Sequence, residues 1–359
     1  MFDLKNIIKA LSRADYSFYV LPALMVLLVV GTVAQAEMGL FRAHQVYFSS
    51  FVFFAGGVVP LPGGYTLVGA LAVGLALKFF FYSEWSWRKA GIILTHFGAL
   101  ILLFGGLMTA VTAEEGFMII PEGEATPYVY DYNQRVLFVF KDDVLLEEHA
   151  FERLEGVLES ALPFGIDVVG RCANCEIFKR DVEGEFRGMA QFMVLSDKAE
   201  ELEPEANFPG VTFVVEGVSE QEGTYIAFEG MPQPIEITQG EHVYKLIFGK
   251  QQRLLPFEIS LRDFVREVYP RTDKPKDYHS DVLVKDGAVE WPVRIGMNEP
   301  LRYKRYTFYQ SSFQQSDLGE ATVLAVVENK GQIFPYIGAL VIALGLMLHM
   351  WMIRQRRLL

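Results

Sequence analysis

The sequence predicts a membrane protein with four transmembrane α-helices and a large, mainly-β extracytoplasmic domain. Of the 359 residues 51% are hydrophobic, yet 21% are charged, and the charge is segregated. Residues 113–332 hold 40 of the 44 acidic and 22 of the 32 basic residues, whereas the remaining residues carry a net positive charge. This pattern is typical of a membrane anchor joined to an acidic water-soluble domain. The aromatic content excludes a disordered chain, and the acidic domain argues against a nucleic-acid partner.

Four stretches are long and apolar enough to cross a bilayer, which takes about 20 helical residues. They are residues 17–36, 65–82, 90–112 and 333–353. Lys78 alone interrupts the second stretch, near its end, where its long side chain can reach the interface. The first stretch follows basic residues and ends in Ala34-Gln35-Ala36, as a signal peptide does, but its apolar core is long for one. We therefore interpret it as a retained helix in contact with membrane lipid.

The basic residues of the short segments indicate the orientation. Three segments on one side of the predicted helices carry them: Lys5, Lys9 and Arg13; Arg88 and Lys89; and Arg354, Arg356 and Arg357. Residues 1–16 and 354–359 are thus predicted to be cytoplasmic, and residues 113–332 periplasmic, in a bacterial inner membrane. The 37–64 loop is itself apolar but too short to span, which favours a helix in the outer interface or a core segment under the soluble domain.

From Arg135 onward, short alternating runs separated by Gly and Pro predict antiparallel β-structure. They are residues 135–140, 191–195, 211–215, 242–248 and 322–327. Asp286-Gly287 between residues 281–285 and 288–295 predicts a tight hairpin, and Pro292 places part of its second arm at a sheet edge or bulge. A β-sandwich or barrel-like domain follows.

His96 is the most informative single residue. It lies about 10 Å inside the third predicted helix, six residues from its basic end. An ionisable side chain at that depth needs a partner, a cavity or a metal, and imidazole is a common haem ligand. The alternative is a neutral histidine hydrogen-bonded to a neighbouring helix. Gly91, Gly98 and Gly105 on the same helix form a small-residue stripe that favours packing against other protein.

The other histidines and the cysteines leave alternatives open. His349 lies near the basic end of the fourth predicted helix and is either a second ligand, a gate or an interfacial residue beside Trp351. His44 is equally ambiguous, and the domain histidines lack metal-type spacing. Cys172 and Cys175 form a CxxC pair, either a disulfide or a redox dithiol, without the histidine of a haem-attachment site.

Three sequence strings resemble the ResB/CcsB family of cytochrome c biogenesis proteins. Pro275–Val284 is similar to that family's PKDYxSD element, Asn298–Ser312 to its NxPLxYKxYTFYQSS stretch, and Gly31–Gln35 to GTxxQ. The resemblance implies a System II subunit that works with a CcsA/ResC-type membrane protein carrying a tryptophan-rich region. Together they would move haem b across the membrane for attachment to apocytochrome c, with His96 as an axial ligand of the haem iron.

The same resemblance implies an unfused, non-catalytic or co-catalytic subunit of the haem lyase (synthase) complex. Arg302, Lys304 and Arg305 form a basic group that would contact haem propionates, the partner, or carboxylates of its own domain. Two other functions stay open: a membrane-anchored thiol-disulfide protein using Cys172 and Cys175, and a scaffold without a cofactor.

Overall fold

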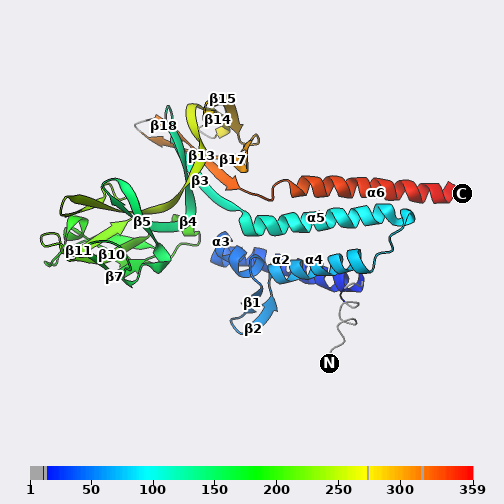
Figure 1. Cartoon of the computed structure of the whole chain (residues 1–359), viewed down its shortest axis with the longest axis horizontal. Helices are drawn as coiled ribbons and strands as arrows, with labels where there is room; N and C mark the ends of the chain where they lie inside the picture. Colours follow the sequence, from blue (N-terminus) through cyan, green and yellow to red (C-terminus); the bar gives the residue numbers. More distant parts are fainter. Residues whose placement is uncertain (1–10, 12–13, 273–274, 317–318, 359) are drawn as a thin grey trace. The chain divides into compact units, whose positions relative to one another are not determined.

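The computed structural model describes residues 11, 14–272, 275–316 and 319–358 (Figure 1). They fold into two compact units. The helical unit comprises Met1–Glu114, Tyr303–Tyr306 and Val327–Leu359, and the β unit comprises Glu115–Arg302 and Thr307–Val326. The basic residues predicted to hold the N-terminus in the cytoplasm, Lys5, Lys9 and Arg13, lie outside the described residues.

Among the described residues, four helices of the helical unit are long and apolar enough to cross a membrane. They are α2 (Ala14–Met38), α4 (Gly64–Phe81), α5 (Ala90–Thr112) and α6 (Phe334–Leu358). All four predicted helices are therefore confirmed, and α5 has the predicted bounds. Figure 1 shows α2 beside α4 and α5 beside α6 within this unit. Few of their side chains are buried, because most of each helical surface faces outward, as lipid-facing helices require.

The 37–64 loop differs from the predicted interfacial helix. Helical structure is limited to α3 (Leu40–Ala43) and the π-turn η1 (His44–Phe48). Strands β1 (Val52–Ala55) and β2 (Val59–Pro62) then form an antiparallel hairpin. The helix prediction is wrong from residue 52 because Gly56 and Gly57 both have positive φ, which suits a tight hairpin turn. Phe53 of the hairpin packs with residues of α2 and α4, so the loop covers its own helices.

In its described part, the β unit contains one ten-stranded, one four-stranded and one two-stranded sheet. The large sheet has the order β15-β14-β13-β4-β3-β18-β17-β16, with β5 and β12 paired beside β4 and β13. Its strands are β3 (Glu114–Pro121), β4 (Ala125–Lys141), β5 (Val144–Ala150), β12 (Ile235–Gln239), β13 (His242–Val268), β14 (Pro275–Asp286), β15 (Val289–Gly296), β16 (Leu301–Tyr303), β17 (Tyr306–Ser316) and β18 (Gly319–Glu328). The small sheets consist of β6 (Gly156–Val157), β7 (Gly165–Cys172), β10 (Gly210–Glu216) and β11 (Gly223–Phe228), and of β8 (Cys175–Lys179) with β9 (Met193–Asp197).

The four-stranded sheet packs against one end of the large sheet and encloses a core. Phe213 and Ile166 from the small sheet meet Leu137, Ile237 and Leu246 from the large one, all 1% exposed or less. This arrangement confirms the predicted sandwich character of the domain. Four of the alternating runs predicted as strands lie in β4, β10, β13 and β18. The run 191–195 is only partly a strand, because η4 (Gly188–Gln191) includes its first residue and β9 begins at Met193.

The predicted Asp286-Gly287 hairpin is confirmed. It joins β14 to β15, with Asp286 opposite Val289 and φ of +61° at Gly287. β15 is an edge strand, which accommodates Pro292, since an edge position does not require the missing N–H of proline.

Candidate functional site

Helices α5 and α6 pack through two facing rows of glycine. A Cβ added to Gly98 of α5 would lie 2.8 Å from the backbone N of Ile342 and 2.9 Å from the carbonyl oxygen of Gly338 on α6. The row continues with Gly91 and Gly105 on α5, while Gly338 and Gly345 line the facing surface of α6. Such contacts are possible only without side chains. The small-residue stripe therefore packs against protein, as predicted, and its partner is α6.

His96 lies on the side of α5 away from α6. It precedes Gly98 by two residues, which places it about 160° around the helix from the glycine row. Its side chain is exposed, and its Nδ1 lies 2.8 Å from the carbonyl oxygen of Ile92 one turn earlier. A carbonyl only accepts hydrogen bonds, so Nδ1 carries a proton, and in the neutral ring Nε2 keeps its lone pair. This tautomer is the one in which imidazole binds a metal through Nε2.

His349 lies on the opposite side of α5. A Cβ added to Gly91 would lie 2.6 Å from the Cα of His349, which places this residue on the α5-facing row of α6 and leaves it half-buried. His96 points away from that face. The helical unit therefore does not bring the two imidazoles together.

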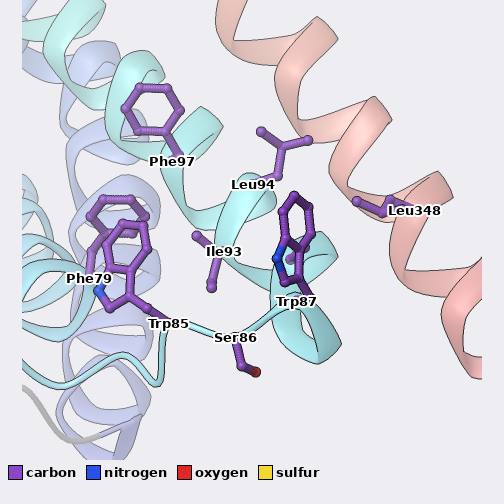
Figure 2. Close-up of a pocket in the computed structure, with 9 residues that line it drawn as sticks. Phe79, Trp85, Ser86, Trp87, Ile93, Leu94, Phe97 and Leu348 are labelled. Carbon is purple, nitrogen blue, oxygen red and sulfur yellow. The ribbon is translucent and has the colours of Figure 1, made fainter.

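An apolar cavity of about 640 Å³ lies at the end of α5 that bears Lys89 (Figure 2). Trp85 and Trp87 from the connector between α4 and α5 line it together with Phe79 of α4, Phe97 of α5 and Leu348 of α6. The ring of Phe79 meets that of Trp85 edge-on, with centroids 5.1 Å apart, and stacks on that of Phe97, with centroids 5.9 Å apart. None of the lining residues has a metal-binding side chain, so the cavity can hold an apolar group but not ligate iron. The sequence interpretation missed it because its walls come from three helices.

Three of the four remaining histidines have local partners. His44 lies 3.2 Å from the hydroxyl of Ser49, His149 3.1 Å from the carboxylate of Glu147, and His242 2.7 Å from that of Asp142. Within the part of the chain that the structure describes, no group of three or more histidine, cysteine or acidic residues is arranged to hold a metal ion.

The basic group of residues 302–305 is divided between local contacts. The guanidinium of Arg302 donates to the hydroxyl of Thr307 at 3.3 Å, and Arg305 forms an ion pair with Glu328 at 3.6 Å. Lys304 has positive φ (+54°) at the turn, and its ammonium lies 5.5 Å from the ring of Tyr303. These contacts favour one of the three alternatives for the basic group, in which its partners are carboxylates and polar groups of the same chain rather than haem propionates or another protein.

Cys172 and Cys175 are joined by a disulfide across the turn between β7 and β8. Each residue is only 6% exposed, and a Cβ added to Gly210 of β10 would lie 3.0 Å from the Sγ of Cys175. Thiol–disulfide exchange needs in-line access of a thiolate to a sulfur atom. The enclosed bond is therefore better suited to holding the β7–β8 turn than to exchange.

The two longer strings that resemble the ResB/CcsB family, Pro275–Val284 and Asn298–Ser312, contact each other inside the β unit. Their spacing in the sequence did not predict this contact. Ser280 of β14 donates to Gln310 of β17 at 2.6 Å and lies 2.8 Å from the hydroxyl of Thr322, all three residues being buried. The hydroxyl of Tyr278 donates to the carbonyl of Ser311 at 3.0 Å. β14 and β17 are not neighbours in the sheet order, so these bonds connect strands that the backbone pairing leaves apart.

A bidentate ion pair connects the string Pro275–Val284 to the edge strand β15. Arg294 of β15 donates through Nε and Nη2 to the two carboxylate oxygens of Asp281 at 2.8 and 3.0 Å. These hydrogen bonds lower the pKa of Asp281 below its ordinary value. The residues of both strings therefore stabilise the β unit, and a catalytic role is not needed to explain them.

Comparison with known proteins finds two matches. Residues 210–323 match the model of the ResB-like family. Protein NrfI of Wolinella succinogenes is 34% identical over 104 residues, which are 28% of this chain and 11% of NrfI. The chain thus matches only about a ninth of the length of that relative. The resemblance to the ResB/CcsB family found in the sequence is confirmed for residues 210–323, which include the strings Pro275–Val284 and Asn298–Ser312.

Proposed function

We propose that this chain, whose residues 210–323 belong to the ResB-like family, serves cytochrome c biogenesis as the haem-handling subunit of a membrane complex. Its partner would be a CcsA/ResC-type membrane protein, its cargo haem b, and its client apocytochrome c. The observation that supports this proposal best is the imidazole of His96, exposed on the outer face of α5 with its Nε2 lone pair free.

His96 fits an axial ligand of haem iron. The Ile92 carbonyl fixes the ring tautomer and supports the basicity of Nε2, as outer hydrogen bonds do for metal-binding histidines. The outward direction of the side chain suits a haem shared with a second membrane protein, because α5 (Ala90–Thr112) carries no other histidine. When bound, haem would supply the iron that holds the tetrapyrrole to the protein during transfer. The chain's own contribution is to hold that iron at a fixed depth on a helix.

The rigid pairing of α5 with α6 supports the same role. Glycine rows leave the two backbones in direct contact, which limits rotation of α5 about its axis. The helix that carries His96 is thereby kept in one orientation toward the partner. The basic clusters around the helices favour cytoplasmic ends and a periplasmic β unit, which would place the acidic domain where cytochrome c is assembled.

The test uses the full chain co-expressed and purified with its CcsA/ResC-type partner. Replacing His96 with Ala should remove the absorption bands of bound haem and the yield of mature cytochrome c, and added imidazole should restore both in part. His349→Ala is the matched control, because His349 lies on the side of α6 that packs against α5. This variant should retain both the haem absorption bands and the yield of mature cytochrome c. Unchanged haem content and cytochrome yield in His96→Ala would refute the ligand role and leave the cofactor-free scaffold.

The thiol-disulfide alternative predicts a different result. Replacement of Cys172 and Cys175 by Ser should then abolish cytochrome maturation while the complex retains haem. The enclosed disulfide leads us to expect normal haem content and maturation at temperatures where the β unit remains folded.

A further inference from the structure

A second pocket lies wholly within the β unit and differs in character from the apolar cavity between the helices. Its volume is about 510 Å³, and it lies between the short turn η4 (Gly188–Gln191), strand β11 and the loop that enters β12. Met189, Met231 and Tyr225 form part of its apolar wall. Its polar lining includes Arg187, Gln233 and Glu236, and the carboxylate of Glu236 lies 3.9 Å from the ammonium of Lys245. None of the notable sequence strings includes these residues.

Arg187 is held in place by its backbone and its neighbours. Its N–H donates to the carbonyl of Thr224 at 2.9 Å, and the Thr224 N–H donates to the carbonyl of Glu185 at 2.7 Å. Gly223 has φ of +138°, and a Cβ added there would lie 3.2 Å from the Cγ of Arg187. The strand edge thus has a glycine where the arginine stem passes, which fixes the direction of the side chain.

The charge of Arg187 lacks a carboxylate partner. Among the described residues no acidic side chain forms an ion pair with it, and its Nε is buried without a hydrogen-bond acceptor. Its Nη1 has one weak contact, 3.5 Å from the carbonyl of Phe186. An unpaired donor of a charged group is costly, and the cost is notable in a domain with nearly twice as many acidic as basic residues. Burial raises the pKa of the neighbouring Tyr225, and the positive charge of Arg187 opposes this rise.

We propose that this pocket binds a carboxylate attached to an apolar group. The carboxylate would accept hydrogen bonds from the guanidinium of Arg187, and the apolar group would pack against Met189, Met231 and the ring of Tyr225. Arginine is suited to this task because its planar donors match the two oxygens of a carboxylate. The ligand is either a free small acid or the carboxyl end of a polypeptide. The site does not involve His96 and is independent of the haem proposal.

The experiment titrates detergent-solubilised full-length protein with N-acetyl-leucine and with N-acetyl-leucinamide, observing the ligands by saturation-transfer NMR against empty micelles. We expect saturable binding of the acid and at least tenfold weaker binding of the amide, as the loss of a charge-assisted hydrogen bond predicts. Arg187→Gln should weaken binding of the acid by at least tenfold without affecting the amide. Lys198→Gln, which removes the same charge at an exposed ion pair with Glu201, is the control and should change neither.

A tripeptide Gly-Gly-Leu with a free carboxyl end distinguishes the two sources of the carboxylate. Tighter binding of the tripeptide than of N-acetyl-leucine identifies a polypeptide end, and weaker binding identifies a small acid. Equal affinity of acid and amide for the wild-type protein overturns the proposal, as does equal weakening by Lys198→Gln and Arg187→Gln. The comparison of acid with amide needs no variant, so it decides the question even where Arg187→Gln does not fold.

Discussion

The contact between α5 and α6 makes a sharp prediction for Gly98. Replacing it with Ala adds one methyl group, whose carbon would lie 2.7 Å from the Cγ1 and 2.8 Å from the backbone N of Ile342. The matched control is Gly106→Ala on the same helix, where an added Cβ has no atom within 4 Å. Both changes bring the same gain in helix propensity, about 1 kcal/mol, so the difference between the variants isolates the steric effect.

The size of that effect follows from the distances. Ordinary contact begins at 3.4 Å, so the backbone of α6 at Ile342 has to retreat by about 0.6 Å. The neighbouring glycine contacts at Gly338 and Gly345 would loosen with it, because they depend on the same separation. Overpacking of a tight interface costs about 1–3 kcal/mol. We therefore expect Gly98→Ala to have a free energy of unfolding about 1–3 kcal/mol lower than Gly106→Ala.

The assay is SDS-induced unfolding of the purified full chain, followed by circular dichroism at wavelengths that report helix. Gly98→Ala should unfold at a lower mole fraction of SDS than Gly106→Ala, which should behave like the wild type or better. If the two variants unfold together, the glycine rows do not hold α5 against α6. The support that this pairing gives to the orientation of His96 would then be lost.

Three further predictions concern the β unit. Ser280→Ala should lower the free energy of unfolding by about 1–3 kcal/mol, because it leaves the buried Gln310 and Thr322 without this hydrogen-bond partner. Ser312→Ala, at an exposed position, is the control and should have little effect; thermal unfolding measures both variants. The disulfide of Cys172 and Cys175 closes a short loop and should contribute roughly 2 kcal/mol, and the folded protein should not react with maleimide after mild reductant treatment. Asp281→Asn should reduce stability near neutral pH but not in strong acid. The hydrogen bonds from Arg294 hold the folded pKa of this carboxyl below its unfolded value. Its contribution to stability is therefore present above the unfolded pKa and is lost as the pH falls through the folded pKa; unfolding midpoints at several pH values test this.

Most of the architecture could be predicted because hydrophobic patterns act locally. A run of about 20 apolar residues requires helix in a bilayer, and alternation with Gly and Pro breaks requires strands. The 52–62 hairpin was missed because a short apolar aromatic run is compatible with either structure. In the structure Gly56 and Gly57 adopt positive φ, which produces a hairpin turn rather than a continuous helix.

The candidate site was only partly visible in the sequence. His96 was identified because an imidazole within an apolar helix is unusual wherever that helix packs. The residues of the two family-like strings were identified too, but not their purpose. Ser280 and Gln310 are 30 positions apart, on strands that are not neighbours in the sheet, and only the tertiary structure brings them together.

The sequence by itself determined which segments are apolar enough for the membrane, where the β unit begins and ends, and which family its strings resemble. Each of these depends on residues close together in the chain. Only the tertiary structure decided that the glycines of α5 face those of α6, that His96 and His349 lie on different sides of α5, and that Arg187 reaches a pocket without a carboxylate partner among the described residues. These are relations between distant segments, and the packing of backbones and buried charges settles them.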